Sequence, residues 1–296
     1  MAKFLARKVS RLVRTLGYEM HRIDRGARST PGDTAAAPPS VNPVWPLPRR
    51  GGGPPDEEIR QAFAKSELWH YAYEFEGGLS FSAHHHHAGP HANDPRRPLQ
   101  RFRHFMPSLV QACGGSLAGK SVLDIACNSG FWSLQCALLG ADVVGFDSRQ
   151  ELIDQADLLK SIVGAPNVDF RVLDFWKMSP QSLGRTFDVV LNLGILYHLP
   201  KPLEALEITR SMSRQFILLD TAVNPWLESA VVLDWEEPRD IRSADTAGIV
   251  AYPSRSAIGL MLRHIRASHW FEIPIRNDDL PRDYLNGKRA SWLISV

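Results

Sequence analysis

The sequence has few cysteines, no long hydrophobic run and no strong overall excess of either charge. Only three of its 296 residues are cysteines, Cys113, Cys127 and Cys136, and no two of them form a CxxC pair. An odd and sparse set favours reduced thiols, and it argues against a disulfide framework, a redox centre or a cysteine metal site. We therefore expect no metal in this protein.

Hydrophobic runs are all too short to cross a bilayer. Lys and Arg interrupt the first twenty residues too often for the apolar core of a signal peptide. The sequence therefore predicts a cytoplasmic protein. With 44% hydrophobic and 22% charged residues, the chain has enough apolar side chains to fill a full globular core.

The small net charge of +2 hides an uneven distribution along the chain. Residues 1–55 carry ten Lys and Arg against three Asp and Glu, a balance of +7. The remainder holds 24 basic and 29 acidic residues, a balance of −5. A mildly acidic body argues against a broad nucleic-acid surface there.

Composition divides the N-terminal part into three regions. Residues 1–24 place apolar side chains at helical spacing among Lys and Arg, which predicts a basic amphipathic helix. Such a helix packs on protein or contacts an anionic membrane, and the pattern fits both. Residues 25–55 are rich in Pro, Gly and Ala and predict a disordered linker. Residues 56–117 predict an accessory helical region, in which the His84–His87 run reads as a solvated loop rather than a metal site.

Strand-like and helix-like segments alternate over residues 118–296. The expected strands are 121–125, 142–147, 168–173, 187–193 and 215–221, and the expected helices are 130–139, 149–162, 178–183, 202–213 and 254–268. This alternation predicts a parallel sheet with helices on both faces. Two further runs, 269–276 and 289–296, can pair as an antiparallel edge. The predicted fold is therefore α/β: a Rossmann-like, seven-stranded, mostly parallel sheet with an antiparallel edge and an N-terminal helical extension.

Small and polar residues follow the first two expected strands, at the sheet edge where ligands collect in such folds. The turn after the first strand contains Ala126, Asn128 and Gly130, which leave room for a ligand against the backbone. The second strand ends at Asp147, seventeen residues past Gly130. A carboxylate at that place can accept hydrogen bonds from two ribose hydroxyls.

The ends of the third and fourth strands carry further candidates. Asp174 and Phe175 suit the exocyclic amine and the face of a purine. The fourth strand runs into "LNLGILYHL", whose candidates are Asn192, Gly194, Tyr197 and His198. Together, these strand ends predict a nucleoside-type cofactor next to ionisable side chains.

The strand ends resemble those of the class I S-adenosylmethionine (SAM) methyltransferases over residues 118–296. The first turn of that family reads approximately D-x-G-x-G-x-G, and here it is Asp124-Ile-Ala126-Cys-Asn128-Ser-Gly130. Two of the three glycines are replaced by residues that are small or tolerant of a left-handed backbone. The resemblance implies SAM as cofactor, no obligatory metal, and a place for Asp124 beside the methionine part of SAM.

A narrower resemblance covers "FDVVLNLGILYHLPKPLEAL". It is similar to the branch that contains the bacterial tRNA wobble-uridine carboxymethyltransferase, which uses carboxy-SAM. Gly194 to His198 match the glycine–small–leucine–tyrosine–histidine string of that branch. The lysine- and tryptophan-containing segment that the tRNA enzyme uses upstream has no counterpart here. Together with the acidic body, this favours ordinary SAM and a different acceptor.

The sequence also offers candidate residues for removing a proton from the acceptor and for binding the acceptor. A hydroxyl acceptor needs a base, and His198 matches that role near neutral pH better than Tyr197. The alternatives are a His198 that bonds the backbone of the next helix and a Tyr197 that lines the donor pocket. Residues 224–254 interrupt the alternation and predict a lid over the acceptor. In this lid Trp226, Glu228 and Trp235 suit a sugar or another polyhydroxylated molecule, unless the insertion is only a surface flap.

The sequence therefore predicts a SAM-dependent methyltransferase that modifies a hydroxyl group of a small molecule or glycan. One alternative is a tRNA wobble-uridine carboxymethyltransferase, since tRNA is disfavoured but not excluded. The other is a non-catalytic SAM-fold adaptor that acts through the basic N-terminal helix at a membrane or in an assembly. The sequence leaves the oligomeric state and the identity of the acceptor open.

Overall fold

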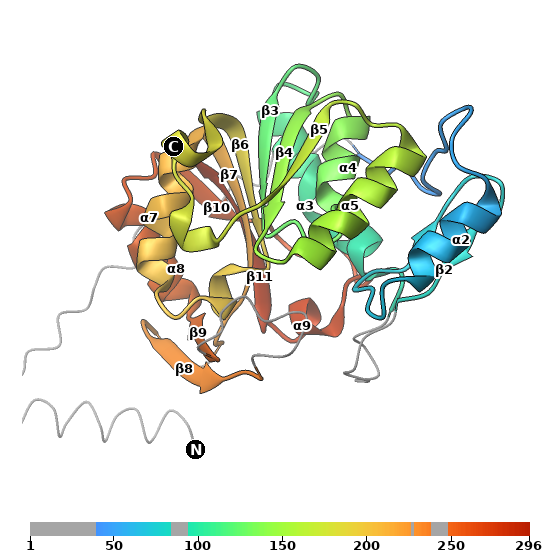
Figure 1. Ribbon diagram of the computed structural model, residues 1–296. Helices are drawn as coiled ribbons and strands as arrows, with labels where there is room; N and C mark the ends of the chain where they lie inside the picture. The colour runs from blue at the N-terminus through green and yellow to red at the C-terminus, as the bar shows by residue number, and fades with distance from the viewer. Residues whose placement is uncertain (1–39, 84–93, 226–227, 238–247) are drawn as a thin grey trace, which may run out of the picture. The chain divides into compact units, whose positions relative to one another are not determined.

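The computed structural model describes residues 40–83, 94–225, 228–237 and 248–296, all of which belong to one compact unit, residues 38–296 (Figure 1). The helix predicted over residues 1–24, the linker up to residue 39, the His84–His87 run and Trp226 lie outside the described residues. In the described part of the chain, no helix is both long enough and apolar enough to span a membrane.

A seven-stranded sheet forms the centre of this unit. Its strands are β3 (Ser121–Ile125), β4 (Asp142–Asp147), β5 (Val168–Val172), β6 (Phe187–Leu193), β7 (Ser213–Ala222), β10 (His269–Glu272) and β11 (Arg289–Ser295). Their order is β10-β11-β7-β6-β3-β4-β5, parallel from β7 to β5, with β11 antiparallel to both of its neighbours. The predicted fold class, strand set and antiparallel edge are confirmed.

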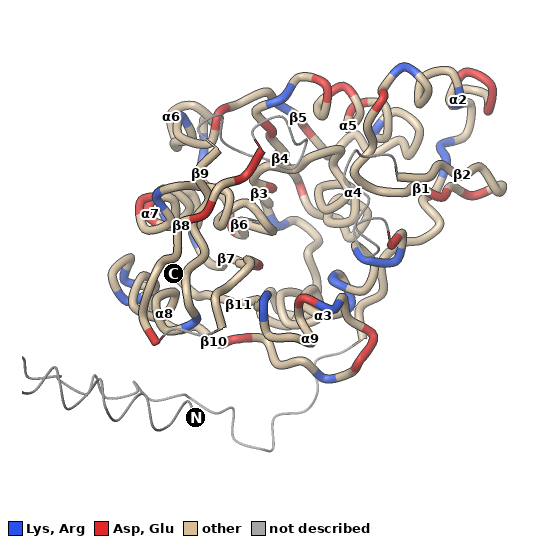
Figure 2. The backbone as a smooth tube through the Cα atoms, turned by 90° about the horizontal axis from the view of Figure 1, so that it is seen from below, with Lys and Arg blue, Asp and Glu red and all other residues tan. Residues whose placement is uncertain are grey.

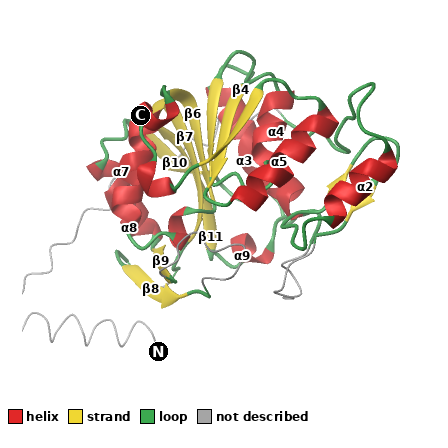
Figure 3. Ribbon diagram, viewed as in Figure 1, coloured by secondary structure: helices red, strands yellow, loops and turns green. Residues whose placement is uncertain are grey.

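Helices cover both faces of the sheet (Figure 3). One face carries α3 (Arg97–Ala112), α4 (Phe131–Leu138) and α5 (Gln150–Val163), and the other carries α6 (Pro180–Leu183), α7 (Pro202–Met212) and α8 (Arg255–His264). Successive strand side chains point to opposite faces, so Val122 joins the first core and Leu123 the second. Burial on both faces explains the nearly continuous apolar strand sequences.

The accessory region packs against the turn that follows β3. It contains α2 (Asp56–Ala64) and a hairpin of β1 (Tyr73–Glu74) with β2 (Ser80–Phe81). The ring of Phe63 stacks on Trp69 and Phe81, with ring centroids 4.1 and 3.6 Å apart. The buried Tyr73 hydroxyl lies 2.6 Å from the Ser129 hydroxyl. The region therefore supports the predicted cofactor turn rather than forming a separate body.

The prediction of a disordered linker up to residue 55 is wrong for residues 40–55. The Leu47 side chain is buried, and its backbone N–H donates to the Glu74 carbonyl at 2.8 Å. The Val44 backbone exchanges two hydrogen bonds with the Gln135 side chain, at 2.9 and 3.0 Å. Proline-rich composition excludes helix and central strand but not an extended segment that packs on the domain through a few apolar side chains.

The interval 224–254 contains a second hairpin, of β8 (Val231–Trp235) and β9 (Ile249–Pro253). It contacts η2 (Leu196–His198), the short helix that follows β6. Tyr252 on β9 stacks on Tyr197, with ring centroids 5.7 Å apart and an interplanar angle of 18°. Two short helices complete the described elements, η1 (Phe175–Lys177) after β5 and α9 (Arg282–Leu285) before β11.

Candidate active site

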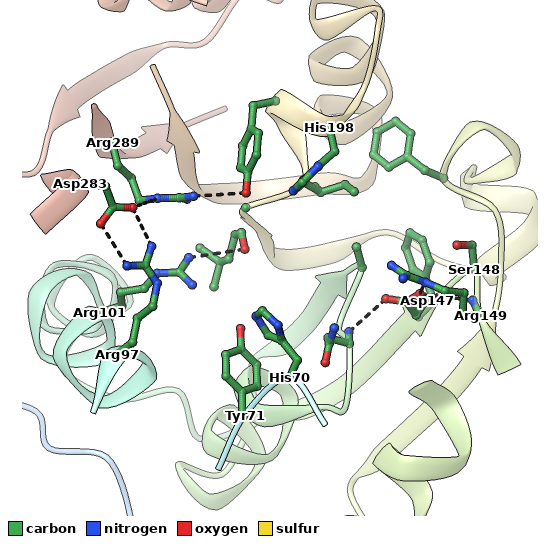
Figure 4. Close-up of a pocket in the computed structure, with 18 of the residues that line it drawn as sticks. His70, Tyr71, Arg97, Arg101, Asp147, Ser148, Arg149, His198, Asp283 and Arg289 are labelled. Carbon is green, nitrogen blue, oxygen red and sulfur yellow. Dashed lines mark hydrogen bonds and ion pairs between the residues drawn. The ribbon is translucent and has the colours of Figure 1, made fainter. Parts of the chain in front are cut away.

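A cavity of about 450 Å³ lies at the carboxyl ends of the parallel strands (Figure 4). Residues that follow β3, β4, β5 and β6 line it, together with residues of α3, α9, β11 and the segment before β1. Its volume falls within the range of small-molecule sites. This is the sheet edge at which the sequence predicts the ligand.

The turn after β3 has the left-handed backbone that its sequence suggests. Ala126 and Asn128 both have φ of 53°, and both line the cavity. Gly130, with φ of 82°, does not line it. A Cβ at Gly130 would lie 2.6 Å from Cζ of Phe170, so this glycine is required by backbone conformation and packing rather than by ligand approach.

Asp147 ends β4 and lines the cavity with its carboxylate almost fully buried. One oxygen accepts from the Asn128 backbone N–H at 3.1 Å, and the other accepts from the Arg149 N–H at 3.2 Å. Burial raises the pKa of Asp147, an effect that the Arg149 charge opposes. A carboxylate fixed in this way joins the two adjacent turns and still has lone pairs for ligand hydroxyls.

Besides Gly130, three predicted cofactor residues do not line the cavity: Asp124, Asp174 and Asn192. Asp124 is buried beside α4, accepts from the Ser133 hydroxyl at 2.7 Å, and has its pKa raised to about 7 by burial. The exposed Asp174 accepts from the Trp176 N–H at 2.9 Å and caps η1. Asn192 lies on the sheet face covered by α7 and donates to Thr209. The alternation of side chains along a strand and local capping decide where these three side chains point. A pattern of residues at strand ends does not predict either effect.

Tyr197 and His198 both line the cavity from η2, next to Gly194. Nδ1 of His198 lies 2.6 Å from Oε2 of Glu236, a residue that follows β8. Both side chains are largely buried, with exposed fractions of 6% and 19%. An ionised carboxylate can only accept, so Nδ1 carries the proton and Nε2 is the basic nitrogen. The predicted alternative, a bond from His198 to the next helix backbone, is not the contact observed.

Among its described residues, the insertion 224–254 contributes none to the cavity lining. Glu228 is exposed, and Trp235 is 67% exposed; neither lines the cavity. Glu236 and Tyr252 instead contact His198 and Tyr197 from behind. In the β8–β9 hairpin Trp235 packs near Gly248, so its aromatic surface serves the hairpin and not the cavity.

A network of buried charges forms the end of the cavity opposite Asp147 (Figure 4). Asp220 on β7 accepts from Arg101 and Arg289 at 2.7 Å each, from Ser291 at 2.7 Å, and from Tyr284. These four donors lower the pKa of Asp220 far below its usual range, although burial opposes them. Asp220 therefore remains ionised and fixes two guanidinium groups at the cavity wall.

A second carboxylate extends this network. Asp283 on α9 accepts two bonds from Arg97, at 2.6 and 3.1 Å, and one from Nε of Arg289 at 2.8 Å. The arginines lower the pKa of Asp283 to about 2 against the effect of burial. The sequence analysis missed this network because its members are far apart in the sequence and follow no local spacing.

The lining residues on the Asp147 side fit a nucleoside-type cofactor. Four predicted residues line the cavity there: Ala126, Asn128, Asp147 and Phe175, whereas Gly194 lines it beside Arg101 and Arg289. The Asp147 carboxylate offers acceptors for ribose hydroxyls, and the Phe175 ring offers a face for a base. The turn after β3 adds the small Ala126 and Asn128 to the same lining.

Comparison with known families gives a match over more than half of the chain. The sequence model of the methyltransferase domain family matches residues 99–265. Two curated relatives are ubiquinone biosynthesis O-methyltransferases. That of Acinetobacter baylyi is 26% identical over 116 residues, which cover 39% of this chain and 48% of the relative. That of Bordetella parapertussis is 28% identical over 118 residues, which cover 40% and 48%. The chain thus spans about half the length of these relatives.

Solved structures show the same fold. The N-terminal domain of EvdMO1, crystallised in the presence of S-adenosylhomocysteine (SAH) and D-fucose, superposes with a TM-score of 0.61 at 21% identity. The match covers 83% of this chain and 98% of that domain. A second structure of the same domain has SAH bound and superposes equally well.

Proposed function

Because the chain belongs to the methyltransferase domain family and is a SAM-dependent methyltransferase, we propose that it methylates a hydroxyl group of a small molecule or glycan. The observation that carries this proposal is the pair formed by His198, which lines the cavity, and Glu236, which contacts it from behind. A base of this kind is needed when the acceptor is a hydroxyl. The O-methyltransferases among the sequence relatives support the same acceptor chemistry.

The chemistry divides between the cofactor and the protein. Bound SAM supplies a methyl group on a sulfonium, and in one displacement an acceptor oxygen forms the O–CH₃ bond while the C–S bond breaks. Nε2 of His198 takes the hydroxyl proton as this happens. Glu236 holds Nδ1–H, and its charge stabilises the imidazolium that results. Asp147 and Phe175 hold the nucleoside part so that the methyl group faces the acceptor.

Tyr197 has a positioning role in this proposal. Nη2 of Arg289 donates to its hydroxyl at 3.4 Å, and the Arg289 guanidinium lies over its ring, 5.2 Å from the centroid. The Tyr197 ring also stacks on Tyr252. A phenol that accepts from an arginine and stacks on a neighbour forms a fixed wall for the acceptor, which leaves His198 as the base.

The test compares His198→Ala and Glu236→Gln with the wild-type enzyme. SAM turnover is measured as SAH release with a panel of hydroxylated acceptors, and SAH affinity is measured by calorimetry. We expect His198→Ala to lower kcat at least about a hundredfold, the usual worth of a positioned base, with SAH affinity within twofold. Glu236→Gln keeps an acceptor for Nδ1–H but removes the charge, so we expect a loss of about tenfold. Unchanged turnover in His198→Ala would refute the assignment of the base.

A second candidate is transfer from carboxy-SAM to a tRNA wobble uridine. The Gly194 to His198 string supports it, as do the arginines beside Tyr197, which could hold the additional carboxylate of such a donor. The acidic balance of residues 56–296 argues against a tRNA surface. Mass spectrometry of the ligand released by denaturing the purified protein tests this candidate, because carboxy-SAM rather than SAM or SAH would favour it.

A further inference from the structure

We propose that the acceptor of this enzyme carries an acidic group, a carboxylate or a phosphate, which binds at the arginine end of the cavity. The arginine end consists of Arg97, Arg101, Arg282 and Arg289, all of which line the cavity. The inference rests on the proposed function, because it assumes that the acceptor occupies this cavity beside the donor.

Three separate elements bring these arginines together. Arg97 and Arg101 lie on α3, Arg282 on α9 and Arg289 at the start of β11. These elements lie close together in Figure 2, where blue segments mark Lys and Arg. In Figure 4, Arg97, Arg101 and Arg289 lie across the cavity from Asp147. The arginine end is therefore distinct from the wall that suits the ribose.

The arginine end has more positive than negative charge. Asp220 and Asp283 pair with Arg97, Arg101 and Arg289, which leaves one guanidinium in excess. Arg282 is exposed on α9 and forms no ion pair within the described part of the chain, so it adds a second guanidinium in excess. Even if Glu236 behind His198 is counted, four arginines face three carboxylates.

Binding of the donor increases this excess. SAM carries a sulfonium, an ammonium and one carboxylate, so its net charge is +1. Its carboxylate can pair with one guanidinium, but the molecule as a whole makes the cavity more positive. Unpaired positive charge in a partly desolvated cavity is costly, and an anion on the acceptor would offset it.

The geometry of the arginine end also suits an anion. Arg101 uses Nε for Tyr284 and Nη2 for Asp220, and its Nη1 makes no hydrogen bond within the described residues. The planar guanidinium of Arg101 is thus fixed with its Nη1 to spare, and the exposed Arg282 lines the same cavity. Carboxylate and phosphate are the groups that such a donor pair recognises best.

The experiment measures binding of small anions to the protein saturated with SAH. Inorganic phosphate and sodium benzoate are titrated by calorimetry at constant ionic strength. The matched variants are Arg282→Ala and Arg276→Ala, the second being an exposed arginine that does not line the cavity. Among the described residues, the Arg282 side chain forms no hydrogen bond or ion pair that the substitution would break, and the backbone bond from Asn286 to its carbonyl is kept.

We expect at least one of the two anions to bind to the wild-type protein and to Arg276→Ala, and about tenfold more weakly to Arg282→Ala, the effect of one charge-assisted hydrogen bond. The stronger of the two probes identifies the group as carboxylate or phosphate. SAH affinity should be the same in all three proteins. Failure of both anions to bind, or equal binding to all three proteins, would overturn the proposal.

A loss of SAH affinity in Arg282→Ala, with the anions displacing SAH, would assign the arginines to the donor carboxylate and also overturn it. Anion binding requires no turnover, so this outcome is independent of whether His198 acts as the base. Turnover of hydroxyl compounds that carry a carboxylate or phosphate, if equal in wild type and Arg282→Ala, would leave O-methylation standing and reject the acidic acceptor.

Discussion

Asp220→Asn is expected to destabilise this protein more than any exposed charge substitution. Asp220 is completely buried, and its carboxylate is the shared partner of Arg101 and Arg289, which are themselves buried. An asparagine has nearly the same shape, but it is neutral and would direct N–H groups toward donors. Arg289 retains Asp283, whereas Arg101 loses its only ion-pair partner among the described residues.

Removal of one partner from a buried ion pair costs about 3–5 kcal/mol. We expect Asp220→Asn to lose about this much free energy of unfolding, measured by urea denaturation at pH 7. The control is Asp142→Asn, which breaks the ion pair with Arg185 at 2.6 Å, where the side chains are 58% and 38% exposed. That pair should contribute less than about 1 kcal/mol. A loss in Asp220→Asn no larger than in the control would refute the account of the network as a buried structural unit.

Two further predictions concern Asp124 and Asp147, the acidic residues of β3 and β4. The folded-state pKa of Asp124 is about 7, above the unfolded value of about 3.9, so ionisation opposes folding. The stability that this group contributes is present below about pH 4 and is lost as the pH rises to 7, by roughly 4 kcal/mol in total. In urea denaturation Asp124→Asn should lack this decline, and equal pH dependence in both proteins would contradict the assignment. Asp147→Ala should weaken SAH binding about tenfold or more in calorimetry, because it removes the acceptor for ribose hydroxyls and the support of the Asn128 turn; unchanged affinity would exclude Asp147 from the donor site.

The sheet was predicted correctly because strand-like and helix-like segments alternate clearly in the sequence. Short β-branched runs such as residues 121–125 and 142–147, separated by helix-compatible segments, admit few arrangements other than a parallel sheet. The chain direction also determines that the strand ends with small and acidic residues meet at one edge. This is why Ala126, Asn128, Asp147 and His198 line one cavity, as their positions suggested.

Local sequence patterns did not predict the direction of individual side chains or the pairing of residues far apart in the sequence. Asn192 lies within β6, two residues before Gly194, and its side chain points to the sheet face covered by α7, where it donates to Thr209. Composition assigned residues 40–55 to a linker, yet Leu47 is buried. A lone apolar residue among prolines gives no periodic signal, although its burial is enough to fix the segment.

The sequence by itself determined the fold class, the order of elements and the edge of the sheet where the cofactor side of the cavity lies. It did so because hydrophobic periodicity and strand-end residues are local properties of the chain. Only the tertiary structure decided which groups complete the cavity. Glu236 reaches His198 across 38 residues, and Arg101 reaches Asp220 across 119. Electrostatic and hydrogen-bonded partners are chosen by distance in space, which sequence spacing does not encode.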